Sequence, residues 1–375
     1  KRKFFYWLTI SNFLYIIVLL ILAVVSIATL TGENGLLTRA NEAKTETEEA
    51  KEDELRRLTA LEAATNLENT IHTDNSTGEE KTVIIPAGFA VSKVEGENTI
   101  EDGLVIIDSK GNEFVWVPVD NVNNMAQCST AGGTCKIELL ETLKCTTHDN
   151  SQIVGKLYAT KEGEEFVENA PNITYTEGIG LREPDTVSDY DNEDIYLNII
   201  KEILTNDKSN YENIKSFKET MQKDFNEMVR SIIQYHGFYI GRYEMSKSNN
   251  NTAQSKANSI ALTSDNDNSN INKNGNTWYG LYAYGKIYSN SLNSVKSSMI
   301  WGCQYDNVMR WMSNNDNGID VNNTNDNIKN TDSTYTGPKG DKDKIKNIYD
   351  LYGGKYEWTL EASNKSYRIV RSRIL

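Results

Sequence analysis

Few residues in this sequence have the type and spacing that catalysis requires. No histidine stands beside a strained serine turn, so nothing predicts a Ser-His-Asp hydrolase. The histidines are His72, His148 and His236. Carboxylate pairs such as Glu183 with Asp185, or Asp350 with Glu357, arise by chance in so acidic a chain, and we expect solvated or buried polar anchors there. The residues therefore predict that the chain is not an enzyme.

The four cysteines predict one disulfide. Cys128 and Cys135 flank a short segment with two glycines, which lets the chain turn back and bring the sulfurs within bridging distance in an oxidising compartment. Cys145 and Cys303 lie far apart in the sequence, and their pairing stays open. A zinc site at Cys145 and His148 would lack two further ligands at suitable spacing, so we do not expect one.

Two other groups of side chains have ligand-binding chemistry. Oxygen-rich stretches at residues 265–268 and 316–326 make calcium binding possible, although neither has the spacing of an EF-hand. Four aromatic side chains are candidates for stacking on sugars, and we expect at least half of them to lie in the core instead. They are Trp278, Tyr279, Tyr282 and Tyr284.

The first element of the chain is an apolar run, Phe4 to Leu30, without a charged residue. About 20 such residues span a bilayer as a helix. Lys1, Arg2 and Lys3 precede the run and favour a cytoplasmic N-terminus, with the rest of the chain outside. A signal peptide and a buried core helix are the alternatives, but the run is too long for a signal peptide. The residues expected to line the membrane or a filament core are Phe4, Phe5, Leu8, Phe13, Leu14, Ile17, Leu20, Leu22 and Val25.

A second helix is expected from Leu36 to about Thr70, after the glycines at 32 and 35. Apolar or small residues recur there three or four apart, and Glu and Lys fill most other positions. They are Leu37, Ala40, Ala43, Ala50, Leu55, Leu58, Leu61 and Ala64 or Thr65. Acid–base pairs four apart, Glu52 with Arg56 and Asp53 with Arg57, support the helix. So narrow a stripe implies a packed partner, which is either the chain's own globular domain or the same helix in neighbouring subunits.

The basic start, the apolar run and residues 30–44 together resemble the beginning of bacterial type IV pilin-like surface proteins. The resemblance implies a helix that first sits in the cytoplasmic membrane and then packs into the core of an extracellular filament, a homopolymer of this chain. Two positions depart from the family pattern. No glycine precedes Phe4, and Leu8 stands where pilins carry a glutamate.

From Lys81 onward the pattern is that of a globular domain. Strands are expected within residues 82–91 and 104–119, the latter with a turn at 108–112, and a further strand within 237–244. An amphipathic helix is expected at 214–232. Helices and strands mix without βαβ repetition, so the predicted class is α+β. The expected division is 1–30 apolar helix, 31–70 amphipathic helix, 71–80 linker and 81–375 exported domain.

Several segments of this domain resemble the formylglycine-generating-enzyme-like domain, a variant of the C-type lectin fold. They are Ile85–Phe89, Phe114–Pro118, Gly237–Glu244, Met299–Trp311, Asn347–Thr359 and Arg368–Arg371. The resemblance suggests Glu357 as the residue for a structural ion. The enzymes of that family carry their catalytic cysteines after the closing motif, and no cysteine follows Cys303 here. A formylglycine-type activity is therefore not expected.

Net charge restricts the partners. The chain carries −14 with a pI near 4.9, so the phosphate backbone of a nucleic acid would be repelled. We expect a pilin-like structural subunit at the cell surface, held in the cytoplasmic membrane before assembly. The alternative is a single-pass anchored protein whose lectin-like domain binds a glycan or another surface protein.

Overall fold

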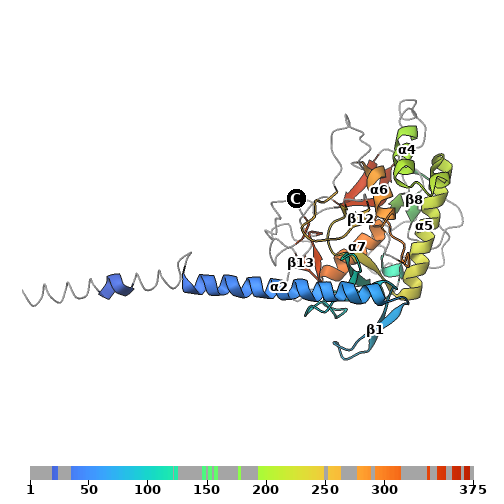
Figure 1. Ribbon diagram of the computed structural model, residues 1–375. Helices are drawn as coiled ribbons and strands as arrows, with labels where there is room; N and C mark the ends of the chain where they lie inside the picture. The colour runs from blue at the N-terminus through green and yellow to red at the C-terminus, as the bar shows by residue number, and fades with distance from the viewer. Residues whose placement is uncertain are drawn as a thin grey trace, which may run out of the picture. The chain divides into compact units, whose positions relative to one another are not determined.

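The structure is a computed structural model, in which the chain forms two compact units, Lys1–Arg57 and Leu58–Leu375. It describes residues 19–23, 35–120, 122–125, 146–148, 151–153, 156–158, 176–178, 193–248, 252–262, 277–288, 292–313, 336–337, 344–351, 357–364 and 367–371. The chain is of the mixed α+β class, as the sequence predicts, with several helices and small antiparallel sheets (Figure 1).

The first unit contains helical residues 19–23 and most of helix α2 (Leu36–Thr65). The composition of α2 is rich in Ala, Glu, Lys, Leu and Arg, which all favour a helix. The predicted pair of Glu52 with Arg56 forms at 3.4 Å, and Lys44 pairs with Glu48 at 3.7 Å. Among the residues that the structure describes, no helix has both the length and the hydrophobicity to cross a bilayer.

Helix α2 ends at Thr65, earlier than the expected boundary near Thr70. The chain then enters strand β1 (Thr70–Asp74), which pairs antiparallel with β2 (Lys81–Ile85). The expected linker at 71–80 is therefore part of a hairpin, with residues 71–74 in β1 and residues 75–80 in the loop. The side chain of Asn66 donates a hydrogen bond to the Phe89 carbonyl at 2.8 Å. This bond gives the helix end a fixed attachment to the domain.

The central sheet has the strand order β10-β5-β4-β3, all antiparallel. Its strands are β3 (Phe89–Val91), β4 (Val105–Asp108), β5 (Glu113–Pro118) and β10 (Gly237–Gly241). The first three follow each other along the chain, with the predicted turn between Asp108 and Glu113. The fourth strand, β10, lies more than a hundred residues further along the chain, and its Phe238 lies opposite Val117 of β5.

Both faces of this sheet are buried. Val115 and Val117 lie in one cluster with Val308 and Met312 of helix α7 (Gly302–Ser313). Trp116, which points to the other face, packs in a separate cluster with residues of β2 and β3. An antiparallel sheet commonly leaves one face to water. Here the Val residues of β5 pack in one hydrophobic cluster and its aromatic residues pack in another, on the opposite face. The expected sheet-core role of this segment is confirmed.

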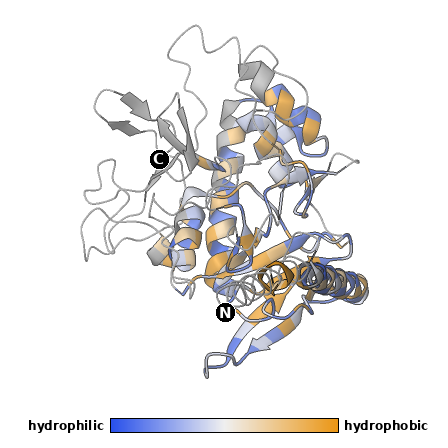
Figure 2. Ribbon diagram, turned by 90° about the vertical axis from the view of Figure 1, so that its left-hand side faces the viewer, coloured by the Kyte–Doolittle hydropathy of each residue, from blue (hydrophilic) through white to orange (hydrophobic). Residues whose placement is uncertain are grey.

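Helix α5 (Ile214–Tyr235) is the predicted amphipathic helix, and its ends are well defined. Asn213 and Ser216 form a reciprocal capping box at its start. His236 closes its end with a left-handed backbone at φ 59°, and its amide donates to the Ile232 carbonyl at 2.8 Å. Hydrophobic and hydrophilic residues alternate along the helices of the domain (Figure 2), as expected of helices that bury one side.

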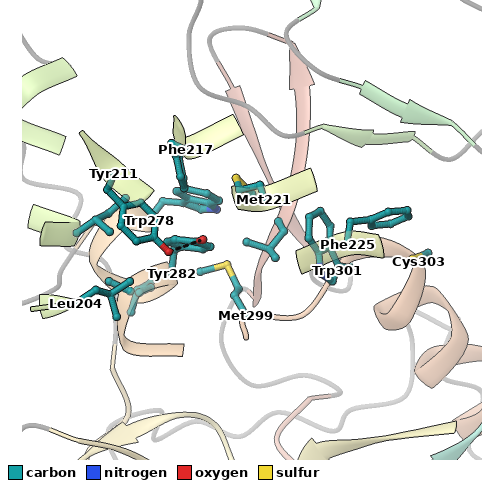
Figure 3. Packing of buried hydrophobic residues seen from close by; sticks show 14 of the residues in the cluster. Leu204, Tyr211, Phe217, Met221, Phe225, Trp278, Tyr282, Met299, Trp301 and Cys303 are labelled. Carbon is teal, nitrogen blue, oxygen red and sulfur yellow. Dashed lines mark hydrogen bonds between the residues drawn. The ribbon is translucent and has the colours of Figure 1, made fainter. Parts of the chain in front are cut away.

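A third core, largely aromatic, lies between α5, α4 (Glu193–Ile203) and α6 (Trp278–Lys286). Trp278 stacks on Tyr282 at 5.6 Å between ring centroids, and Phe225 meets Trp301 edge to face at 5.0 Å (Figure 3). Short 3-10 helices η1 (Val122–Met125) and η2 (Lys208–Tyr211) border this core.

The remaining strands form two-stranded antiparallel sheets. They are β6 (Thr146–His148) with β7 (Ser151–Ile153), β8 (Lys156–Tyr158) with β9 (Thr176–Gly178), β11 (Ser246–Lys247) with β12 (Ala253–Gln254), β13 (Lys344–Ile345) with β14 (Ile348–Tyr349), and β15 (Glu357–Asn364) with β16 (Tyr367–Arg371).

The β13–β14 turn joins late and early parts of the domain. The side-chain amide of Asn347 donates to the carbonyls of Gly96 at 2.8 Å and Gly103 at 2.9 Å. Lys346 pairs with Glu101 at 2.8 Å. Gly103 has φ +96°, and a Cβ there would lie 2.0 Å from the Lys346 carbonyl oxygen, so only glycine allows this approach.

Candidate functional site

The histidines have structural surroundings wherever the structure describes them. His236 is the C-cap of α5, and His72 lies on β1 with its Nε2 atom 2.9 Å from the Asn98 carbonyl. His148 lies in β6, and its side chain is outside the described residues. Within the described ranges, no three His, Cys, Asp or Glu side chains gather as a metal site would require. Neither described histidine stands beside a candidate nucleophile.

Most of the aromatic side chains considered for sugar stacking are buried, which confirms the expectation that at least half belong to the core. Trp278, Tyr282 and Tyr284 are all buried, and Tyr279 is half-buried against the same cluster. The indole nitrogen of Trp278 donates to the Thr359 carbonyl at 2.9 Å. These rings hold α6 in the domain and do not form a platform for sugars.

Several other expected site residues lie outside the described residues, so what the sequence predicts for them stays a prediction. They are Cys128, Cys135, Cys145, Glu183, Asp185 and the oxygen-rich stretches 265–268 and 316–326. Cys303 is buried in the aromatic core as a packing residue. Asp350 is also buried and accepts a hydrogen bond from the Gly337 amide at 3.0 Å. Glu357 opens strand β15 and is half-buried.

The strongest electrostatic feature is a buried ion cluster around Arg242, directly after β10. Its guanidinium lies 2.7 Å from Glu97 and 2.9 Å from Glu113, and its side chain is 0% exposed. Burial disfavours the charged form, but the neighbouring Tyr243 and the two carboxylates outweigh it and raise the pKa of Arg242 above its ordinary value. The arginine is therefore a permanent cation held between two buried acidic side chains.

This cluster is closed on all sides that the structure describes. Tyr243 and Tyr349 stack on each other at 5.2 Å, and the Arg242 guanidinium lies 5.2 Å from the Tyr349 ring. Glu97 also accepts a hydrogen bond from the Ser92 hydroxyl at 2.5 Å. A reactive site needs a face open to substrate, and these groups are all buried. We read the cluster as an anchor that joins β5, β10 and the β13–β14 turn.

A second buried carboxylate, Asp108, organises the turn between β4 and β5. It accepts hydrogen bonds from the hydroxyl of Tyr288 at 2.7 Å and from the side-chain amide of Asn112 at 2.8 Å. Burial and the adjacent carboxylate both raise the pKa of Tyr288, so its phenol stays a proton donor. Asn112 in turn accepts from the Ser255 amide at 3.2 Å. The side chains of Asp108, Asn112 and Tyr288 therefore all form hydrogen bonds within the domain.

A third polar group lies at the edge of the aromatic core. Lys286 pairs with Asp224, and its Nζ atom is 3.3 Å from the hydroxyl of Tyr282. Burial works to lower the pKa of Lys286, but the Asp224 carboxylate outweighs it and raises the pKa. Because this lysine stays protonated at neutral pH, it lacks the free electron pair that a nucleophile needs.

Among the described residues of the first unit, the short helical segment 19–23 has an unusual surface. Leu19, Leu20, Ile21 and Leu22 are between 49% and 60% exposed, although all four are large hydrophobic residues. Of the residues expected to line a membrane or filament core, Leu20 and Leu22 are therefore described and exposed. Those outside the described residues are Phe4, Phe5, Leu8, Phe13, Leu14, Ile17 and Val25.

No protein-family model, no curated protein and no solved structure matches this chain. The exposed apolar helical segment is the feature of the described residues best suited to binding. Its side chains are about half exposed, so their transfer from water into lipid or protein contributes about half of the roughly 1.5–3 kcal/mol that full burial of each would give. The polar clusters, in contrast, already satisfy one another inside the domain.

Proposed function

We propose that this chain is a structural subunit of an extracellular surface filament of the pilin type. In this proposal its apolar N-terminal segment sits first in the cytoplasmic membrane and then in the filament core. The acidic domain is displayed outside. The observation that carries the proposal is the row of exposed leucine and isoleucine side chains at 19–22, inside a run of 27 residues, Phe4 to Leu30, without a charge.

Water is a poor solvent for such a segment. Four consecutive large hydrophobic side chains at about half exposure are unusual on a soluble surface, where apolar side chains are normally scattered singly. Lipid or copies of the same segment would both cover them. The net charge of −14 opposes association of copies of this chain, so the apolar contact of a filament has to outweigh that repulsion.

We further propose that the second unit is a lectin-like domain of the formylglycine-generating-enzyme type without its chemistry. The segments that carry this resemblance lie together. Phe114–Pro118 and Gly237–Gly241 are neighbouring strands. The Tyr349 amide donates to the Arg242 carbonyl at 2.9 Å, and Glu357 lies opposite Arg371 in the pair of β15 and β16.

A second candidate function is a single-pass anchor that presents the same domain as a monomer. The three basic residues Lys1, Arg2 and Lys3 are compatible with it as well as with the filament, because they set the orientation of the apolar run in a membrane. In this reading the domain binds a glycan or another surface protein. The burial of Trp278 and Tyr282 removes the aromatic platform that would have favoured a glycan.

Shearing of intact cells distinguishes the two candidates. For a filament subunit, electron microscopy of the sheared material shows filaments, and antibodies against the domain label them along their length. For an anchor, the chain stays with the cells and appears as a monomer in detergent extracts. Detection of the chain only as that monomer would refute the filament proposal.

A further inference from the structure

The tight turn between β2 and β3 has backbone groups that need partners from elsewhere in the chain. The Phe89 amide donates to the Pro86 carbonyl at 3.1 Å, and Gly88 has φ +82°, which is typical of the third residue of a type II turn. The amides of Ala87 and Gly88 take no part in that bond. Because both residues are buried, an amide without an acceptor would be costly there.

Two asparagines between α2 and β1 supply these partners. The Gly88 amide donates to the backbone carbonyl of Asn66 at 2.7 Å, and the Ala87 amide donates to the Oδ1 atom of Asn69 at 2.9 Å. The Nδ2 atom of Asn66 donates to the Phe89 carbonyl at 2.8 Å. Asn66 therefore binds the turn at two points, once as an acceptor and once as a donor.

Further contacts hold the same place. Thr59 and Ala63, in the last turns of α2, are completely buried, so the helix end packs against the domain. The Ser294 hydroxyl donates to the Ala87 carbonyl at 2.5 Å, which attaches the turn to a distant part of the chain. All of these residues belong to the second unit. The turn is thus bonded to the helix end and to the body of the domain at once.

We propose that these bonds form a rigid joint, so that the last turns of α2 and the central sheet move as one body. Segments that connect a helix to a domain are commonly mobile, and residues 66–69 would then act as a hinge. The joint removes that hinge and fixes the direction in which the domain is presented with respect to the helix end. It goes beyond the filament assignment and holds equally for an anchored protein.

The opposite roles of the two asparagines give a chemical test. Asn66 uses the donor end of its side chain, which aspartate lacks, whereas Asn69 uses the acceptor end, which aspartate keeps. In hydrogen-exchange mass spectrometry of the full chain in mild detergent, Asn66→Asp should speed exchange of the 86–90 amides at least about fivefold, as expected for one lost hydrogen bond. Asn69→Asp should change that rate by less than about twofold, and Asn69→Ala should raise it about fivefold.

The matched control is Asn98→Asp, the same replacement at an exposed position of the same unit, which should leave exchange of the 86–90 amides unchanged. Equal rates in N66D and N98D would overturn the proposal. So would an N69D rate as fast as that of N69A, since the acceptor of the Ala87 amide would then not matter.

A distance measurement tests the motion itself. Spin labels carried by unnatural amino acids at Leu61 and Lys110, both exposed, report on the helix end and on the β4–β5 turn without use of the native cysteines. Their distance distribution should be as narrow as that of a reference pair at Lys110 and Arg230. Combined Asn66→Ala and Asn69→Ala should widen it at least about twofold and leave the reference pair unchanged. A distribution already broad in the chain with intact asparagines, or one that the double variant does not widen, would overturn the proposal, whatever shearing shows about filaments.

Discussion

Substitution of Arg242 by methionine should destabilise the domain strongly. The change removes the cation that lies 2.7 Å from Glu97 and 2.9 Å from Glu113 while both carboxylates stay buried. Removal of one partner from a buried ion pair costs about 3–5 kcal/mol, because the remaining charge is uncompensated. For a unit of this size that loss corresponds to a fall in melting temperature of roughly 4–8 °C.

The assay is thermal unfolding of the full chain in detergent, followed by near-ultraviolet circular dichroism of the aromatic core. The matched control is Arg230→Met, which makes the same replacement at an exposed position of α5 and should shift the melting temperature by less than about 2 °C. A fall of less than about 2 °C for R242M would refute the reasoning that the cluster is a buried anchor.

Removal of the two acids in the same variant isolates the cause. Replacement of Glu97 and Glu113 by glutamine in R242M should recover at least about half of the lost stability, because no uncompensated charge is then left buried. A loss that this replacement does not reduce would point to packing around the arginine and not to its charge.

Three further predictions concern other parts of the chain. Burial raises the pKa of Asp74, but hydrogen bonds from Ile100 and Ser76 outweigh it, so the pKa falls below 3.8. D74N should therefore lower the free energy of unfolding by about 1–2 kcal/mol at neutral pH, as measured by urea titration. The difference in stability between D74N and the unsubstituted chain should disappear as the pH falls through the lowered pKa. Leu20→Arg should reduce the membrane-bound fraction after an alkaline wash, since arginine at mid-bilayer costs about 2.5–3.5 kcal/mol; an unchanged fraction would contradict membrane insertion. Lys296→Ala breaks an exposed ion pair of 2.6 Å and should change stability by less than about 1 kcal/mol, and a larger loss would show that the pair is not screened by solvent.

Periodicity was sufficient to predict part of the regular structure. The spacing of apolar residues gave α2, the strands around the 108–112 turn and α5 near their observed bounds. These elements follow from local preferences together with one buried side. Strand β1 was missed, because only Ile71 in its five residues is a large apolar side chain and it is exposed. Its pairing with β2 is set by the hairpin turn and not by a hydrophobic pattern.

The buried ion cluster around Arg242 could not be predicted from the sequence, for a different reason. A charged residue within the apolar segment Gly237–Tyr243 is a detectable signal, since a buried arginine requires a counter-ion. Its partner Glu113 is 129 residues away in a chain rich in carboxylates, so the sequence does not show which acid is chosen. The partner becomes known only with the register of β5 and β10.

The attachment of Asn347 to Gly103 spans 244 residues. A ribosome that adds about 5–20 residues per second needs roughly 10–50 s between these two positions. Until residue 347 emerges, the loop at Gly96–Gly103 lacks the amide that satisfies its carbonyls, so the nascent domain stays incomplete throughout synthesis. A domain whose early loop is completed by residue 347 reaches its native contacts only after most of the chain between these two positions has been made.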